Sequence, residues 1–178
     1  MKTMNLKLFF VPLMMFMTYL ADAQMQAAKR ITYDVDTTLI FNAKRSVVWD
    51  LIKDPSQWDK ISNGNILSIK TNGTLGEDGK LADLTLEISC ADGSKWKEKV
   101  MQFQPVFRFI VLQVTDPVPN GVTDNLISMV VNAETEKSCS MSYRIKVEGS
   151  NPGRHELLSH LTNEMRAYIK GIHQKLTQ

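Results

Sequence analysis

Residues 41–58 read FNAKRSVVWDLIKDPSQW, and the period of the apolar residues changes inside this stretch. Just before it, residues 31–41 alternate between apolar and polar side chains, which is typical of a half-buried strand. Within it, four apolar residues share one face of a helix, and Asp54-Pro55 ends that helix. We therefore predict a strand over 31–41, a helix over 43–53 and a second short helix around Trp58. The four apolar residues are Val47, Val48, Leu51 and Ile52.

Downstream of Asn63 the sequence has the pattern of strands for nearly ninety residues. Turn residues such as Asp92-Gly93 and the segment 117–121 separate short runs of apolar and β-branched side chains. Because these connections are short, consecutive strands must run antiparallel as a meander. The predicted strands are 64–72, 80–90, 95–104, 107–116, 125–134 and 138–148.

The last element predicted is a long amphipathic helix. Asn151 is expected to cap it, and Pro152 to occupy its first position. Its apolar stripe must pack on the sheet, which makes the domain α+β. The stripe consists of Leu157, Leu158, Leu161, Met165, Tyr168, Ile169, Ile172 and Leu176, and we place Glu164, Arg166, Lys170 and Lys175 on the other faces.

The N-terminus has the features of a cleavable signal peptide over residues 1–23. Two lysines precede an uncharged apolar segment from Leu8 to Leu20, and Ala21-Asp22-Ala23 provides small residues at the cleavage site. The apolar segment is shorter than the roughly 20 residues that span a bilayer. We predict an exported protein, periplasmic or secreted, with a short segment at 24–30, one domain over 31–178 and no integral membrane segment after cleavage.

The charge of the chain is nearly balanced, since 21 basic and 19 acidic residues give a formal net charge of +2. Nucleic-acid binding requires a concentrated basic surface that displaces counterions, so we expect no nucleic-acid partner. The densest basic stretch, 95–99, alternates with Trp96 and Glu98 and is expected to form the solvated face of a strand.

The stretch 41–58 resembles the opening of the SRPBCC superfamily, which includes START-like, polyketide-cyclase-like and birch-pollen-allergen-like proteins. Those proteins commonly follow their first strand with an alanine, a Val-Trp pair, an aliphatic pair, Asp-Pro and a second tryptophan. The segment 95–100, followed by Gln104-Pro105, is also similar to their fourth strand and its turn. The matching residues at the opening are Ala43, Val48, Trp49, Leu51, Ile52, Asp54, Pro55 and Trp58.

This resemblance implies the helix-grip fold, in which a strongly bent antiparallel sheet of about seven strands grips a long C-terminal helix, with two short helices after strand one. It also implies an apolar cavity between sheet and helix for a lipid, a sterol, an aromatic polyketide or a plant hormone. No cofactor and no metal follow from it. The predicted lid of the cavity is the segment 116–124.

Alternation along the strands identifies the residues expected to line that cavity. They equally suit a filled core, and methionine slightly favours a cavity because its thioether side chain is flexible. The predicted ligand-binding residues are Leu84, Leu86, Ile88, Trp96, Glu98, Met129, Met141, Tyr143, Met165 and Ile169.

The position of Glu98 depends on the Asp92-Gly93 hairpin. A bulged hairpin turns Trp96 and Glu98 inward, whereas a simple two-residue turn would turn Lys97 and Lys99 inward instead. Burying two lysines costs more than burying one carboxylate, so we predict the bulge. An inward Glu98 can orient a ligand or, with Tyr143, act as an acid or base.

The cysteines and histidines carry no chemistry in this prediction. Cys90 ends one strand and Cys139 begins another at the opposite end of the sheet, so both thiols are predicted to be free. The three histidines lack the spacing of metal ligands and are expected at the surface. They are His155, His160 and His173.

The leading hypothesis from the sequence is therefore an exported protein that binds a hydrophobic or aromatic small molecule without catalysis. Two alternatives stay open. One is an enzyme similar to polyketide cyclases and dehydratases, with Glu98 and Tyr143 as its candidate catalytic residues. The other is a domain with a filled core that binds another protein.

Overall fold

Seven strands and three helical segments make up the part of the chain that the computed structural model describes, residues 32–76 and 83–177. The predicted signal peptide, the segment 24–30 and the start of the predicted strand 80–90 lie outside these residues. The elements are β1 (Val35–Phe41), α2 (Arg45–Ile52), the 3-10 helix η2 (Pro55–Ile61), β2 (Ile66–Thr74), β3 (Asp83–Cys90), β4 (Lys95–Gln104), β5 (Phe109–Asp116), β6 (Val122–Ala133), β7 (Cys139–Gly149) and α3 (Gly153–Leu176).

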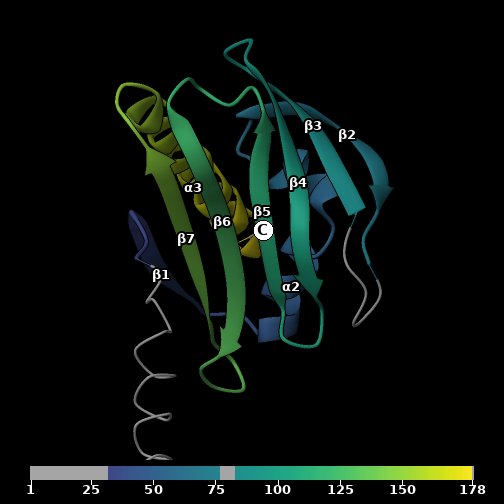
Figure 1. Ribbon diagram of the computed structural model, residues 1–178. Coiled ribbons are helices and arrows are strands. Elements are labelled where there is room, and N and C mark those ends of the chain that lie inside the picture. Colours follow the sequence, from purple (N-terminus) through teal and green to yellow (C-terminus); the bar gives the residue numbers. More distant parts are fainter. Residues whose placement is uncertain (1–31, 77–82, 178) are drawn as a thin grey trace, which may run out of the picture. The chain divides into compact units, whose positions relative to one another are not determined.

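The strands form one antiparallel sheet in the order β1-β7-β6-β5-β4-β3-β2. Strands β2 to β7 follow each other as the predicted meander, and β1 pairs with β7 from Val35↔Ile145 to Phe41↔Cys139. Both α2 and the long α3 lie on the same face of the sheet (Figure 1). The predicted α+β helix-grip architecture is confirmed. Within the described ranges, no helix is long and apolar enough to cross a membrane.

The switch from strand to helix occurs where the apolar period changes. Lys53 ends α2, and the carboxylate of Asp54 accepts a hydrogen bond from the Ser56 backbone N–H at the start of η2. Trp58 then donates its indole N–H to the carbonyl oxygen of Ile52 at 2.9 Å. This bond ties the second segment to the end of the first, and the second segment is a 3-10 helix.

Asn151 does not cap α3. The helix begins at Gly153, Pro152 occupies the capping position, and no side-chain hydrogen bond caps the helix. The backbone is tightly packed at this point, because a Cβ atom at Gly153 would overlap the carbonyl oxygen of Asn120 in the β5–β6 loop. The predicted lid segment therefore lies directly against the N-terminus of α3.

The sheet is not paired along its full length between β5 and β6. Backbone pairing there runs only from Phe109↔Val130 to Leu112↔Ile127. Beyond it, the side-chain amide of Asn125 accepts from the backbone N–H of Val114 at 2.7 Å and donates to the Val114 carbonyl oxygen at 3.0 Å. The Asn125 side chain thus makes the two hydrogen bonds that a paired backbone would make where β5 and β6 diverge.

The two cysteines lie at opposite ends of the sheet. Cys90 precedes the β3–β4 hairpin at one end, and Cys139 follows the β6–β7 hairpin at the other (Figure 1). Both are buried and free, as predicted.

Candidate functional site

The residues predicted to line a cavity lie between the sheet and α3. All of them are buried except Ile169, which is half-buried and packs against the same apolar cluster. On β3, for example, Leu84, Leu86 and Ile88 are buried whereas the intervening Glu87 is exposed. The structure thus brings the ten predicted residues to one interior, and whether they bind a ligand stays a prediction.

The β3–β4 hairpin has the predicted bulge. The backbone N–H of Gly93 donates to the Cys90 carbonyl oxygen at 3.1 Å, and the backbone N–H of Cys90 donates to the Ser94 carbonyl oxygen at 2.9 Å. Gly93 has a φ of 88°, the left-handed conformation that follows the turn in this kind of three-residue loop. Leu86 consequently pairs with Glu98, and Glu98 faces the interior.

The lysines on either side of Glu98 point to the outer face. Lys97 pairs with Asp116 at 3.1 Å, and Lys99 pairs with Asp83 at 3.3 Å. Both ion pairs are largely exposed to solvent. The hairpin register therefore keeps the ammonium groups in water and places one carboxylate in the interior, as expected.

A second buried carboxyl group, that of Glu164, lies close enough to Glu98 for their charges to interact. Glu164 of α3 is 4% exposed and Glu98 is 1% exposed, so the prediction that Glu164 lies on a polar face of the helix was wrong. Among the residues described, the Glu98 Oε1 and Glu164 Oε2 atoms are buried without a hydrogen-bond partner. Buried polar atoms are normally bonded, so such a pair requires an explanation.

The charge of Glu164 predicts an exposed position, but its spacing along the helix predicts a buried one. The buried residues of α3 recur at intervals of four and three, and position 164 belongs to that series. A helical position in such a series faces the core regardless of its residue type. The series includes Leu157, Leu161, Glu164, Tyr168 and Gly171.

Burial and mutual repulsion keep protons on this pair of carboxyl groups. Burial raises the pKa of Glu98 well above its usual value, and the charge of Glu164 raises it further. Burial also raises the pKa of Glu164 to about 7, against a hydrogen bond from Tyr168 that lowers it. Two carboxyl groups that share a buried environment titrate as a pair. Near neutral pH the pair is therefore at least partly protonated.

Two tyrosines complete the polar part of the interior. The hydroxyl group of Tyr168 donates to Glu164 Oε1 at 2.9 Å, and the Tyr168 ring meets Trp58 edge to face. Tyr143 of β7 is buried, and burial followed by the charges of Glu164 and Glu98 raises its pKa well above 10. Tyr143 therefore stays protonated and can donate a hydrogen bond, but it does not act as a base near neutral pH.

The expectation that all three histidines lie at the surface was wrong for His160. Its ring stacks on Trp96 with centroids 3.8 Å apart, because α3 presents His160 one turn before Glu164 to the inner face of β4. Burial lowers the pKa of His160. His155 and His173 are exposed, and the His173 ring lies against Phe41.

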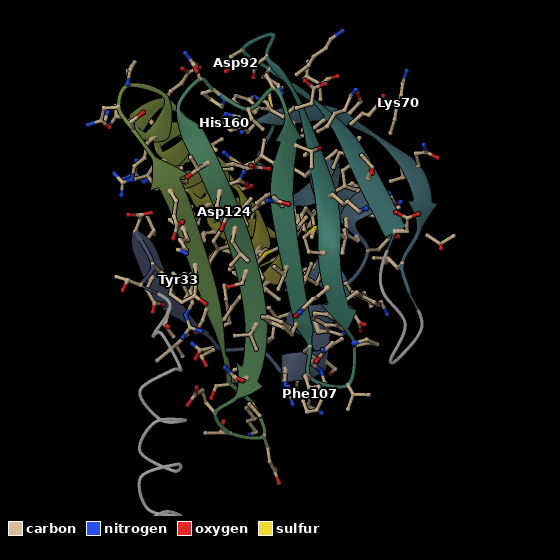
Figure 2. The ribbon with its side chains drawn as sticks, in the orientation of Figure 1. Tyr33, Lys70, Asp92, Phe107, Asp124 and His160 are labelled. Carbon is tan, nitrogen blue, oxygen red and sulfur yellow. The ribbon has the colours of Figure 1, made fainter. Side chains whose placement is uncertain are left out.

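Polar groups connect this stack to the rim of the sheet. The indole N–H of Trp96 donates to Ser94 Oγ at 3.1 Å, and Ser94 Oγ donates to the Asp92 carboxylate at 2.6 Å. That bond lowers the pKa of Asp92. Figure 2 shows Asp92 and His160 at the same end of the molecule, where the β5–β6 loop also lies.

The outer face of the sheet has a separate shallow hollow of about 170 Å³ along β3 and β4. Exposed side chains of both charges line it, and Lys97 is already paired with Asp116 there. In residues 32–76 and 83–177, no three potential metal ligands lie together. The expectations of no metal and no cofactor stay predictions.

The sheet, the two short helical segments after β1 and the long α3 give this chain a helix-grip fold. No protein-family model and no curated protein sequence matches the chain. The comparison with solved structures is therefore what supports this assignment.

Three solved structures illustrate the likeness. XoxI from Bacillus cereus has a TM-score of 0.64 and 17% identity, over 81% of this chain and 95% of that one. Norcoclaurine synthase from Thalictrum flavum, solved in complex with dopamine and hydroxybenzaldehyde, has a TM-score of 0.62 and 17% identity, over 80% and 85%. A protein from Nitrosospira multiformis has a TM-score of 0.61 and 14% identity, over 78% and 92%. At these identities the likeness shows the fold.

Proposed function

We propose that this chain is an exported protein that binds a hydrophobic or aromatic small molecule between the sheet and α3. The observation that carries the proposal is Glu98, a buried carboxyl group with an unpartnered oxygen in the middle of an apolar wall. Ligand sites combine such walls with a few polar groups that orient the ligand.

This observation favours a ligand site over a core that only stabilises the fold. A buried polar group without a hydrogen bond costs a few kcal/mol, and an apolar side chain such as leucine in its place avoids that cost. Both Glu98 and Glu164 have a buried carboxyl oxygen without a hydrogen-bond partner. Groups of this kind form hydrogen bonds with ordered water or with polar atoms of a ligand.

The fold neighbours support the same class of function. Norcoclaurine synthase, which shares the fold, was solved with dopamine and hydroxybenzaldehyde, so in that protein the fold accommodates small aromatic molecules. The apolar part of the present interior is suited to an aromatic or aliphatic body. Trp96, Met129 and Met141 provide large, polarisable side chains there.

A second candidate function is acid–base catalysis of the cyclase or dehydratase kind. The observation in its favour is that burial raises the pKa of Glu164 to about 7, the range in which a carboxyl group both gives and takes a proton. Glu98 then serves as the partner carboxyl group, and Tyr143 donates a hydrogen bond. A substrate-bound structure with Glu98 or Glu164 at a reacting atom separates this function from simple binding.

The test of the binding proposal is native mass spectrometry of the protein purified from its own host. We expect a mature chain that begins at Gln24 and carries one apolar molecule, which denaturing extraction then releases for identification. A chain that retains residues 1–23 contradicts export. Bare protein that also fails to take up any of a panel of lipids, sterols and aromatic compounds contradicts the binding function.

A further inference from the structure

In the part of the chain that the structure describes, no positively charged side chain is among the groups that act on the carboxyl groups of Glu98 and Glu164. The titratable groups that burial and charge couple to the pair are Cys90 of β3, Tyr143 of β7 and Tyr168 of α3. The next titratable group along α3, His160, is stacked on Trp96, and burial lowers its pKa. Within the described residues, the pair is thus surrounded by neutral or acidic groups.

The free oxygens require hydrogen-bond donors. Tyr168 already donates to Glu164 Oε1, which leaves Glu164 Oε2 and Glu98 Oε1 to be satisfied. A hydroxyl group supplies one donor, whereas a protonated amine supplies three donors and a positive charge. Charge-assisted bonds of that kind are roughly twice as strong as neutral ones. An anionic group is repelled by the negative charge that the pair carries.

From this geometry we propose that Glu98 and Glu164 together bind the protonated amino group of an otherwise apolar ligand. The inference rests on the proposed binding function and specifies the class of ligand. Binding is an exchange, because the incoming ammonium group replaces a proton that the two carboxyl groups share. The carboxyl O–H bond breaks, the proton passes to water or buffer, and no bond of the ligand forms or breaks.

The test compares ligands that differ only in the charge of one group. Tryptamine, tryptophol and indole-3-acetate share an indole ring and carry a cation, a hydroxyl group and an anion; octylamine and octanol repeat the comparison on a chain. Isothermal titration of the mature protein at pH 7, in two buffers of different ionisation enthalpy, measures affinity and proton release together. We expect each amine to bind at least tenfold more tightly than its alcohol, to release a proton, and indole-3-acetate to bind most weakly.

Two variants locate the effect. Glu164→Gln and Glu98→Gln keep the shape of the side chain and remove its charge, so each should lose the preference for amines and the proton release while alcohols still bind. Glu87→Gln, at an exposed position on the outer face of β3, is the matched control and should behave as the wild type. Circular dichroism checks that all three variants are folded.

The outcomes separate this inference from the proposed function. Alcohols that bind as tightly as amines, or a preference for amines that survives in both interior variants, overturn the amine site and leave the binding function standing. If no member of the panel binds, and the protein from its host is bare, both proposals fall.

Discussion

The imidazole of His160 on α3 stacks on the indole of Trp96 on β4, with the ring centroids 3.8 Å apart and the planes 21° from parallel. This contact shows how α3 is rotated over the sheet. Because Glu98 lies two residues after Trp96 and Glu164 one turn after His160, the same rotation brings the two carboxyl groups together.

The stack makes the stability of the protein sensitive to acid. Since burial lowers the pKa of His160 below its usual 6.5, the folded protein binds this proton less readily than the unfolded chain. The stabilisation is present above pH 6.5 and is lost as the pH falls toward the lowered pKa. His160→Phe keeps a ring but does not titrate. We therefore expect its free energy of unfolding in urea to rise relative to that of the wild type as the pH is lowered from 7.5 to 5. A difference that is the same at both pH values contradicts this.

Glu164 should have the opposite pH dependence. Its folded-state pKa of about 7 lies above the usual 4.5, so its contribution is fully present below pH 4.5 and is lost as the pH rises through 7. Glu164→Gln should therefore become more stable relative to wild type by on the order of 3 kcal/mol between pH 4.5 and 8. Urea unfolding at the two pH values measures this, with Glu87→Gln as the control. If both substitutions change the free energy of unfolding by the same amount between the two pH values, the pKa of Glu164 is not raised in the folded protein.

Asn125 should be needed for the integrity of the sheet. Asn125→Ala leaves the N–H and carbonyl groups of Val114 without the side chain that bonds both. Two unsatisfied buried groups should cost roughly 2–4 kcal/mol in the free energy of unfolding. Asn132→Ala, at an exposed position on the same strand, should cost less than about 0.5 kcal/mol. Similar losses at the two positions would argue against the role of Asn125.

The thiols should be inert in the folded protein. Cys90 and Cys139 are buried, and burial raises the pKa of both, so neither forms the reactive thiolate readily. At pH 8 we expect Ellman's reagent to detect no thiol in the native protein and two after denaturation. Rapid reaction of the native protein, or fewer than two thiols after denaturation, is the contrary result.

The order of elements could be predicted because it depends on local periodicity. The change of period at residues 41–58 identified the strand followed by two short helices, and the short turns required an antiparallel meander. Even the inward position of Glu98 followed from a local choice, since the alternative hairpin would have buried Lys97 and Lys99. These features are determined by neighbouring residues.

The missed features depend on contacts between distant segments. The charge of Glu164 predicts a polar face of α3, whereas its spacing places it in the buried series, and its partner Glu98 is 66 residues away in the chain. The stack of His160 on Trp96 and the bonds from Asn125 to Val114 likewise join different elements. The start of α3 also differs by one residue from the prediction, at a point where Gly153 packs against Asn120 of a distant loop.

The polar side chains that α3 turns toward the sheet follow one another at four-residue intervals, His160, Glu164 and Tyr168. Replacing any of them alters the chemistry of the interior but breaks no pairing between strands. The polarity of the interior is therefore set by residues along a single helix, independently of the hydrogen bonds that hold the sheet together.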